Sequence, residues 1–252
     1  MTTTLTEGEI LHAEHGVNLI RKGHYLNDAS ILSRWAPDLA AFNDEDHVFT
    51  GTGAGTPVQL DKLGNWVRLP TGSSDNNEIY MQSPGENFIF NTTDIVYIRA
   101  RVTADPTTAG DGGLVVGFSD TIATDFIVDA GTGLATSFDG AAWVVTEDTT
   151  TAHEVDAVSS NASSQVIDTG VFTFTEGDDV TLEILYDPGD GTTAKVFFLK
   201  DGALKAVHAL TISGLLEMHG VVGGKTFSGE VNNFDFTNIE AIQRVKKVAT
   251  NP

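Results

Sequence analysis

The sequence predicts an all-β fold, an antiparallel β-sandwich or jelly roll, preceded by an N-terminal arm that contains short helical turns. From about residue 75 onward, short apolar runs of strand length alternate with turn residues at the spacing typical of sandwiches. This part shows no alternation of strands with helical periods, which argues against a parallel sheet. The chain contains 26 glycines and no cysteine, so turns are frequent and no disulfide framework is available.

The clearest single strand is Ile95–Val102, where apolar and polar residues alternate. Val96, Ile98, Ala100 and Val102 fall on one face, and Tyr97, Arg99 and Arg101 on the other, as in a strand with one buried face. Leu114–Ser119 is apolar throughout, which predicts a strand buried on both faces. Weaker strands are expected at Asn76–Ser83, Trp143–Thr146, Val166–Ile167 and Val171–Thr175.

The strongest local signal predicts a three-stranded antiparallel meander over residues 180–210. Its strands are Val180–Tyr186, Ala194–Leu199 and Leu204–Leu210, joined by a turn at Asp187–Gly191 and a tight Asp201-Gly202 turn. A last strand, Asn233–Val245, alternates Phe234 and Phe236 and then changes register near Ile239, which predicts a β-bulge there.

The first residues differ in pattern, so we divide the chain into an N-terminal arm at 1–42 and a jelly-roll domain at 43–252. Thr6 and Glu9 have the spacing of a capping box, and helical spacing of apolar residues follows up to Ile20. Asp28–Trp35 is expected to form a second short helical turn, ending before Pro37. The arm is expected to pack either on its own sandwich or on a partner subunit.

Charge is concentrated in one part of the chain. The net charge is −21, from 35 acids and 14 bases. Residues 102–194 carry 17 acids and no lysine or arginine, whereas residues 1–101 sum to −6 and residues 195–252 to +2. This acid-rich middle repels nucleic acid and anionic membranes. It predicts a solvated face, with divalent-cation binding or an outward face in a crowded assembly as functional alternatives.

Several classes of site have no sequence signal. There is no apolar run of ~18 residues, no basic and apolar leader, and no phosphate-binding glycine loop. Gly117–Thr121 lacks the second glycine of a nucleophile elbow. The one basic cluster in sequence is Arg244, Lys246 and Lys247, which is too small to indicate nucleic-acid binding. We therefore expect neither a nucleic-acid nor a membrane partner.

No catalytic, cofactor-binding or metal-ligating residue is assigned. His12 and His15 are interpreted as surface residues of the arm. Calcium is left open because the chain is rich in aspartate, and calcium prefers several oxygen ligands. The candidate pairs are Asp75 with Glu78, Asp187 with Asp190, and Asp178 with Asp179, and each is interpreted first as turn chemistry.

A pair of acids resembles half of a glycosidase motif. Glu154 and Asp156 stand two residues apart, which places them on one face of a strand, as in the E-x-D-x-x-E pattern of jelly-roll glucanases. Ser159 occupies the position of the second essential glutamate and cannot act as a general acid. Few aromatic residues lie nearby, and Trp66 and Trp143 are interpreted as core. We therefore predict that the protein is not an enzyme.

Three segments resemble the concanavalin A-like, laminin-G-like jelly roll, and in particular structural proteins of tailed bacteriophages. They are Tyr97–Val102, Gly117–Asp120 and the hairpin Val196–Gly202, and the resemblance covers roughly residues 60–245. It implies a virion component of the capsid-decoration type. Related cellular modules bind carbohydrate, often with calcium, but their metal-site residues have no matching positions here.

The preferred hypothesis is a non-enzymatic decoration protein that binds the major capsid protein on the capsid exterior, with a trimer favoured as its homo-oligomer. The acid-rich middle would then face solvent, with the arm and the Arg244–Lys247 tail on the attachment side. The alternative is a carbohydrate-binding module for attachment to a host surface. A glucanase-like hydrolase that uses Glu154 and Asp156 is the third hypothesis.

Overall fold

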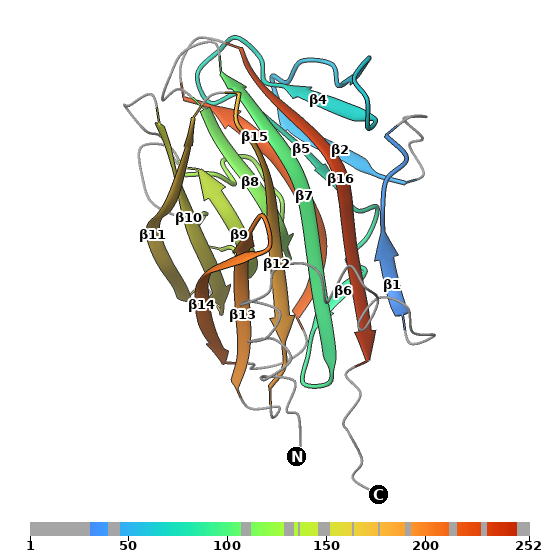
Figure 1. The fold of residues 1–252 in the computed structure, drawn as a ribbon, viewed down its shortest axis with the longest axis vertical. Helices are drawn as coiled ribbons and strands as arrows, with labels where there is room; N and C mark the ends of the chain where they lie inside the picture. The colour runs from blue at the N-terminus through green and yellow to red at the C-terminus, as the bar shows by residue number, and fades with distance from the viewer. Residues whose placement is uncertain are drawn as a thin grey trace, which may run out of the picture.

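The computed structural model shows a sandwich of two antiparallel sheets packed face to face (Figure 1). Among the described residues there are sixteen strands and no helix. None of these residues belongs to a helix that could cross a membrane. The described residues are 31–39, 46–106, 112–128, 134–135, 137–145, 152–162, 164–175, 177–189, 193–211, 216–227 and 231–245.

Sheet A has eight strands in the order β14-β13-β12-β7-β16-β4-β3, with β1 also pairing with β16. These strands are β1 (Ile31–Trp35), β3 (Val58–Leu60), β4 (Trp66–Pro70), β7 (Asp94–Pro106), β12 (Asp179–Asp187), β13 (Thr193–Lys200), β14 (Ala203–Thr211) and β16 (Asn232–Val245). One edge of β16 is shared, because β4 pairs with its first half and β1 with its second half.

Sheet B also has eight strands, in the order β11-β10-β9-β8-β15-β5-β2, with β6 pairing with β15. They are β2 (Val48–Thr52), β5 (Glu78–Gln82), β6 (Phe88–Phe90), β8 (Gly112–Ser119), β9 (Gly140–Val145), β10 (Ala152–Asn161), β11 (Ser164–Thr175) and β15 (Leu216–Thr226). Here β5 and β6 share one edge of β15 in the same way.

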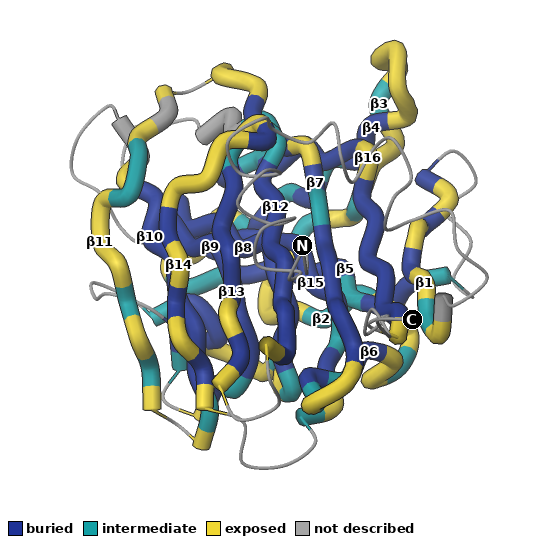
Figure 2. The backbone as a smooth tube through the Cα atoms, turned by 60° about the horizontal axis from the view of Figure 1, so that its bottom comes forward, coloured by how far each residue is buried: buried dark blue, intermediate teal, exposed yellow. Residues whose placement is uncertain are grey.

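The main core lies between the sheets, where the inward side chains of both interdigitate. Trp143 of β9 is fully buried there and packs edge-on against Phe172 and Phe198. Its indole Nε1 donates a hydrogen bond of 3.0 Å to the Glu183 carbonyl. Figure 2 shows the central strands buried, and exposure increases toward β11 and the β3–β4 turn. Burial of this apolar area is the dominant stabilising term for such a fold.

Most of the predicted strands are confirmed. The meander corresponds to β12, β13 and β14, and Asp201 and Gly202 both have positive φ, at 51° and 78°, as a tight hairpin turn requires. β8 is buried along its whole length, and the predicted inward residues of β7 are all fully buried. The two weak strands predicted near residues 166 and 171 are one strand, β11.

The helical turn expected at Asp28–Trp35 is wrong for the part that the structure describes. Residues 31–35 form β1, which pairs with β16 and buries Trp35 in the core between the sheets. The remaining helical expectation falls on residues 1–30, outside the described residues. The predicted boundary at residue 42 also falls in an undescribed stretch, 40–45, and stays a prediction.

The predicted bulge in the last strand is confirmed, and it changes which residues face outward. The register of β16 against β7 shifts between Thr237 and Glu240, where Asn238 has a φ of 51°. Before the shift Phe236 faces the core, and after it Ile239 does. Asp235 and Glu240 are five residues apart, a spacing that would put them on opposite faces of a regular strand. The bulge places both on the outward face of sheet A.

Candidate binding site

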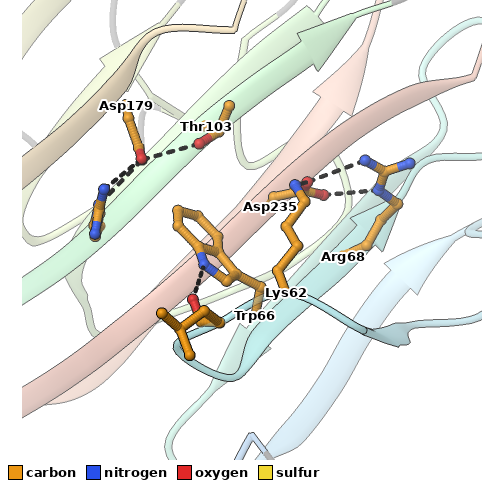
Figure 3. A network of polar contacts seen from close by, with 8 residues as sticks. Lys62, Trp66, Arg68, Thr103, Asp179 and Asp235 are labelled. Atoms are coloured by element: carbon orange, nitrogen blue, oxygen red, sulfur yellow. Dashed lines mark hydrogen bonds and ion pairs between the residues drawn. The ribbon is translucent and has the colours of Figure 1, made fainter.

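A row of ion pairs crosses the outward face of sheet A along β16. At one end, the Asp235 carboxylate accepts hydrogen bonds from Lys62 Nζ at 2.6 Å and from Arg68 Nε at 2.7 Å and Nη2 at 3.0 Å (Figure 3). Lys62 comes from the β3–β4 turn and Arg68 from β4, directly opposite Asp235 in the ladder. One buried carboxylate therefore binds two bases.

The other end of the row repeats this arrangement. The Glu240 carboxylate accepts hydrogen bonds from Arg34 Nη2 at 2.8 Å and from Arg99 Nη2 at 3.0 Å. Arg34 lies on β1 and Arg99 on β7, the two strands that flank this half of β16. Again two bases from neighbouring strands share one carboxylate.

Trp66 lies between these two ends, beneath two cations. Lys62 Nζ and the Arg101 guanidinium each lie 5.4 Å from the centre of its ring, within the range of cation–π attraction. Trp66 Nε1 donates a hydrogen bond to the Leu63 carbonyl at 3.2 Å, which fixes the β3–β4 turn. Trp66 is buried as predicted, but it lies on the outward face of sheet A and not in the core.

Arg101 has a carboxylate of its own. Its Nη2 lies 2.5 Å from an Asp179 oxygen, and Thr103 Oγ1 donates a hydrogen bond to the same carboxylate at 3.0 Å (Figure 3). We call Arg34, Lys62, Arg68, Arg99 and Arg101 the basic row. These five of the chain's fourteen lysines and arginines face three carboxylates in the pairs described here.

At each end of the basic row one base is much more exposed than the carboxylate it binds. The Lys62 side chain is 47% exposed, whereas that of its partner Asp235 is 1% exposed. The Arg34 side chain is also well exposed above a nearly buried Glu240. At these two positions an approaching ion therefore meets a cation first, although the chain as a whole is strongly acidic.

A pocket of about 380 Å³ opens at the β1 end of the basic row. It lies where β1 closes the edge of the sandwich, beside the turn that leads from β5 to β6. Its lining is Arg34, Trp35, Ala36, Asp46, Pro84 and Asn87. Trp35 Nε1 donates a hydrogen bond of 2.8 Å to the Asp46 carbonyl, which joins two walls of the pocket. The lining residues thus include an arginine, an aspartate and an asparagine, residue types that together donate and accept hydrogen bonds.

Part of the outward face of sheet B, over β5, β8, β9 and β15, is covered by the chain itself. We call the described residues between Asp120 and Asp139 the cover segment. Its Phe126, Ile127 and Leu134 pack on this face in a second apolar cluster, separate from the main core. Lys225 of β15 is fully buried beneath it and donates hydrogen bonds to Asp125 Oδ1 at 2.8 Å and to the Ile127 carbonyl at 3.1 Å.

Two further titratable groups lie beneath the cover segment. Glu78 accepts hydrogen bonds from Tyr80 Oη at 2.8 Å and from the Asp125 backbone N–H at 2.9 Å. Burial raises the pKa of Glu78, against the opposing effect of these hydrogen bonds. Burial likewise raises the pKa of Tyr80 well above its ordinary value. The hydrogen bond between Glu78 and the Asp125 N–H links the cover segment to the sheet.

Glu154 and Asp156, the glucanase-like acids, lie on one face as expected, but Ser159 at the third motif position lies on the other face. Glu154 and Asp156 belong to β10 and face outward from sheet B, whereas Ser159 faces the interior. Asp156 is nearly buried and accepts a hydrogen bond of 2.8 Å from the Gly170 N–H. Burial raises the pKa of Asp156. A side chain at position 159, where the motif has its second glutamate, therefore lies on the opposite face from Glu154 and Asp156.

Ser159 takes part in a constellation that the sequence did not indicate. Its Oγ lies 2.8 Å from His208 Nδ1, and His208 Nε2 lies 3.4 Å from an Asp168 carboxylate oxygen. In a Ser-His-Asp hydrolase the serine meets Nε2, so the ring is reversed here. Ser159 is also fully buried between the sheets, where no substrate reaches it. The constellation links the edge strand β14 to β10 and β11.

The calcium candidates have local partners. The Asp178 carboxylate accepts hydrogen bonds from Thr175, which lower the pKa of Asp178. Asp187 accepts one from the Gly189 N–H, which is turn chemistry as predicted. In the part of the chain that the structure describes, no group of three or more His, Asp or Glu side chains could hold a metal. Asp190, His12 and His15 lie outside it, so calcium binding stays a prediction.

The basic cluster expected at the C-terminus is largely outside the described residues. Lys246 and Lys247 are not described, and Arg244 is nearly buried on β16. The basic row could not be inferred from the sequence, because its members lie on four separate segments. The one available signal was the alternation of Ile95–Val102, which places Arg99 and Arg101 together on the face opposite the core.

No protein-family model matches the chain, and no curated protein matches it. Solved structures do match. The carbohydrate recognition domain of Emp47p has a TM-score of 0.56 at 13% identity, covering 87% of this chain and 99% of that domain. The endo-beta-1,4-glucuronan lyase from the fungus Trichoderma reesei has a TM-score of 0.53 at 8% identity, covering 86% of this chain and 96% of the lyase. The metal-free Emp46p carbohydrate recognition domain has a TM-score of 0.51 at 9% identity, covering 86% of this chain and 97% of that domain. At these identities the likeness concerns the fold, which is that of a concanavalin A-like, lectin-like β-sandwich.

Proposed function

We propose that the protein is a carbohydrate-binding domain and that its glycan binds in the pocket beside Trp35. The observation that carries the proposal is the pocket itself, whose lining at one edge of the sandwich includes an arginine, an aspartate and an asparagine. Sugar hydroxyls both donate and accept hydrogen bonds, so they require such a mixed lining. The volume of about 380 Å³ falls in the range of small-ligand sites.

The fold supports this proposal over a capsid role. Emp47p and Emp46p are both described as carrying carbohydrate recognition domains of the same fold. None of the solved structures named above is described as a virion protein. The capsid-decoration hypothesis, with its trimer, its capsid partner and its place on the capsid exterior, draws no support from these neighbours and stays a prediction.

We propose no catalytic activity, although a lyase shares the fold. Glu154 and Asp156 do share a face, but Asp156 is nearly buried and holds the Gly170 N–H. Incubating the protein with β-1,4-glucan and with β-1,4-glucuronan, and following new reducing ends, tests this. We expect no turnover. A turnover that disappears in Glu154→Gln would establish a hydrolase or lyase instead.

A glycan array, screened with and without calcium, is the first experiment for binding. We expect retention of at least one glycan class. Asn87→Ala removes the pocket amide and should weaken that binding, whereas Gln59→Ala, an exposed change on β3, should leave it unchanged. No retention of any glycan in either condition, or equal binding by both variants, would contradict the proposal.

A further inference from the structure

We propose that the glycan is an anionic polysaccharide and that the basic row binds its carboxylate groups. This inference rests on the proposed function and specifies its ligand class. The carrying observation is that five bases gather on one face of a chain whose net charge is −21. Such a concentration opposes the overall field of the protein, so it attracts anions to that face.

The carboxylates lie beneath the bases, and this arrangement favours the binding of an external anion. Asp235 and Glu240 are each shared by two bases, so neither carboxylate neutralises both of its partners. Both carboxylates are buried or nearly so, and one cation above each of them, Lys62 or Arg34, is well exposed. The buried acids hold the bases in place and leave an excess of positive charge at the surface. Arginine in such a position forms bidentate pairs with carboxylate or sulfate groups.

The geometry favours an extended polymer over a single sugar. From Ile242, beside Arg34, to Asp235, beside Lys62, the row follows β16 for about 20 Å at the usual rise of a strand. Arg34 belongs both to the basic row and to the lining of the pocket, so the two surfaces are continuous. A chain with repeating carboxylates can occupy the pocket with one unit and follow the row with the next ones.

The competing occupant is an acidic protein surface, for which the acid-rich residues 102–194 of a second copy are the available example. Continuity of the row with a polar pocket favours the glycan, because a flat protein contact does not need the pocket. The two occupants predict different effects of the same variants, which the experiment uses.

The test compares two hexasaccharides that differ only in their carboxylates, β-1,4-linked glucuronate and β-1,4-linked glucose, by titration calorimetry. The row variant is Lys62→Gln with Arg101→Gln, which leaves Arg68 on Asp235 and Thr103 on Asp179. The control is Lys195→Gln with Lys205→Gln, which removes the same charge from exposed positions on β13 and β14. Thermal melts verify that both variants fold.

We expect the glucuronate to bind more tightly than the glucose oligomer and to lose about tenfold in affinity in the row variant, but not in the control. Added NaCl should weaken the glucuronate complex only. Equal binding of both glycans, unaffected by the row variant, would overturn the anionic ligand and leave the proposed function standing. Binding of neither glycan, nor of any array member, would overturn both. Salt-sensitive self-association that only the row variant abolishes, with no glycan binding, would assign the row to contacts between copies.

Discussion

The two outward faces of the sandwich use the same kind of ion pair in opposite arrangements. On sheet A, Lys62 is 47% exposed and its partner Asp235 is 1% exposed. On sheet B, Lys225 is 0% exposed and its partner Asp125 is 67% exposed. Sheet A therefore presents cations to solvent, and sheet B presents anions, although each pair is one lysine and one aspartate.

The difference shows that accessibility, and not composition, decides which charge a face offers to a ligand. On sheet B the cover segment buries Lys225 and packs over the strands around it. Sheet A has no such cover over the basic row among the described residues. We therefore expect a ligand to bind on sheet A and at its edge, and the ion pair on sheet B to stabilise the fold.

The largest expected effect comes from loosening the cover segment with Phe126→Ala. Phe126 packs edge-on against Tyr80 and Phe138 at ring distances of 5.6 and 5.8 Å. Truncating a buried phenylalanine costs about 3–5 kcal/mol of unfolding free energy. We expect that loss in denaturant melts, together with faster acetylation of Lys225 in peptide mass spectrometry. Lys62 serves as the internal control, since it should react equally in both proteins.

Removing the carboxylate from each pair should be more costly on sheet B. Asp125→Asn removes the carboxylate that Lys225 contacts directly and leaves Glu78 as an acidic neighbour. We expect a loss of about 2–3 kcal/mol, less than for a fully buried ion pair, because Asp125 is solvent-exposed. Asp235→Asn removes the carboxylate that Lys62 and Arg68 share, and Lys62 can turn toward water, for a loss of about 1 kcal/mol. Urea unfolding of the two variants measures the order, and the reverse order would refute the comparison.

His208, at the edge between the sheets, should make stability depend on pH. Burial lowers the pKa of His208 below its ordinary value of 6.5, although Asp168 acts in the opposite direction. Below that value the unfolded state binds the proton more readily than the folded state. The contribution of His208 to stability is therefore complete above pH 6.5. It is lost as the pH falls from that value through the lower pKa of the folded state.

His208→Gln isolates this effect from Glu78 and Asp156, whose raised pKa values act in the opposite direction as the pH falls. We expect the stability difference between wild type and variant to shrink as acid is added from neutral pH. A difference that stays constant over this range would show that His208 is not titrating with unfolding.

The smallest expected effect is that of Leu63→Ser. Leu63 is fully exposed at the tip of the β3–β4 turn, beside Lys62 of the basic row. Substitutions at such positions change stability by less than about 0.5 kcal/mol. Thermal melts should therefore coincide with wild type. Weaker glycan binding by this variant would show that the ligand also contacts the turn, and a lower melting temperature would contradict the exposed placement.

Local signals made part of the fold predictable. β7 could be inferred because its alternation is uninterrupted, and the β13–β14 hairpin because Asp201-Gly202 specifies a tight turn. β15 could not, because Gly220, Gly223 and Gly224 interrupt its strand pattern. Two of these glycines are needed for packing, since a Cβ would meet the Trp35 ring at Gly220 and the Phe234 ring at Gly224.

The candidate site was less predictable than the fold. The basic row depends on strands β1, β4 and β7 lying beside β16, and such neighbours cannot be derived from one sequence. Asp235 and Glu240 face outward together because of the bulge. The sequence predicts the bulge but does not show that it brings the two carboxylates to one face. The pocket depends on β1 forming a strand, where a helical turn was expected.

The three tryptophans provide the most direct test of where a glycan binds. Trp35 lines the pocket, Trp66 lies under the basic row, and Trp143 is in the core. Each indole N–H donates to a backbone carbonyl and gives one signal in a ¹H–¹⁵N spectrum. Titration with the glucuronate hexasaccharide should shift the signals of Trp35 and Trp66 and leave that of Trp143 in place. Saturable binding that leaves the signals of both Trp35 and Trp66 unmoved would contradict the account.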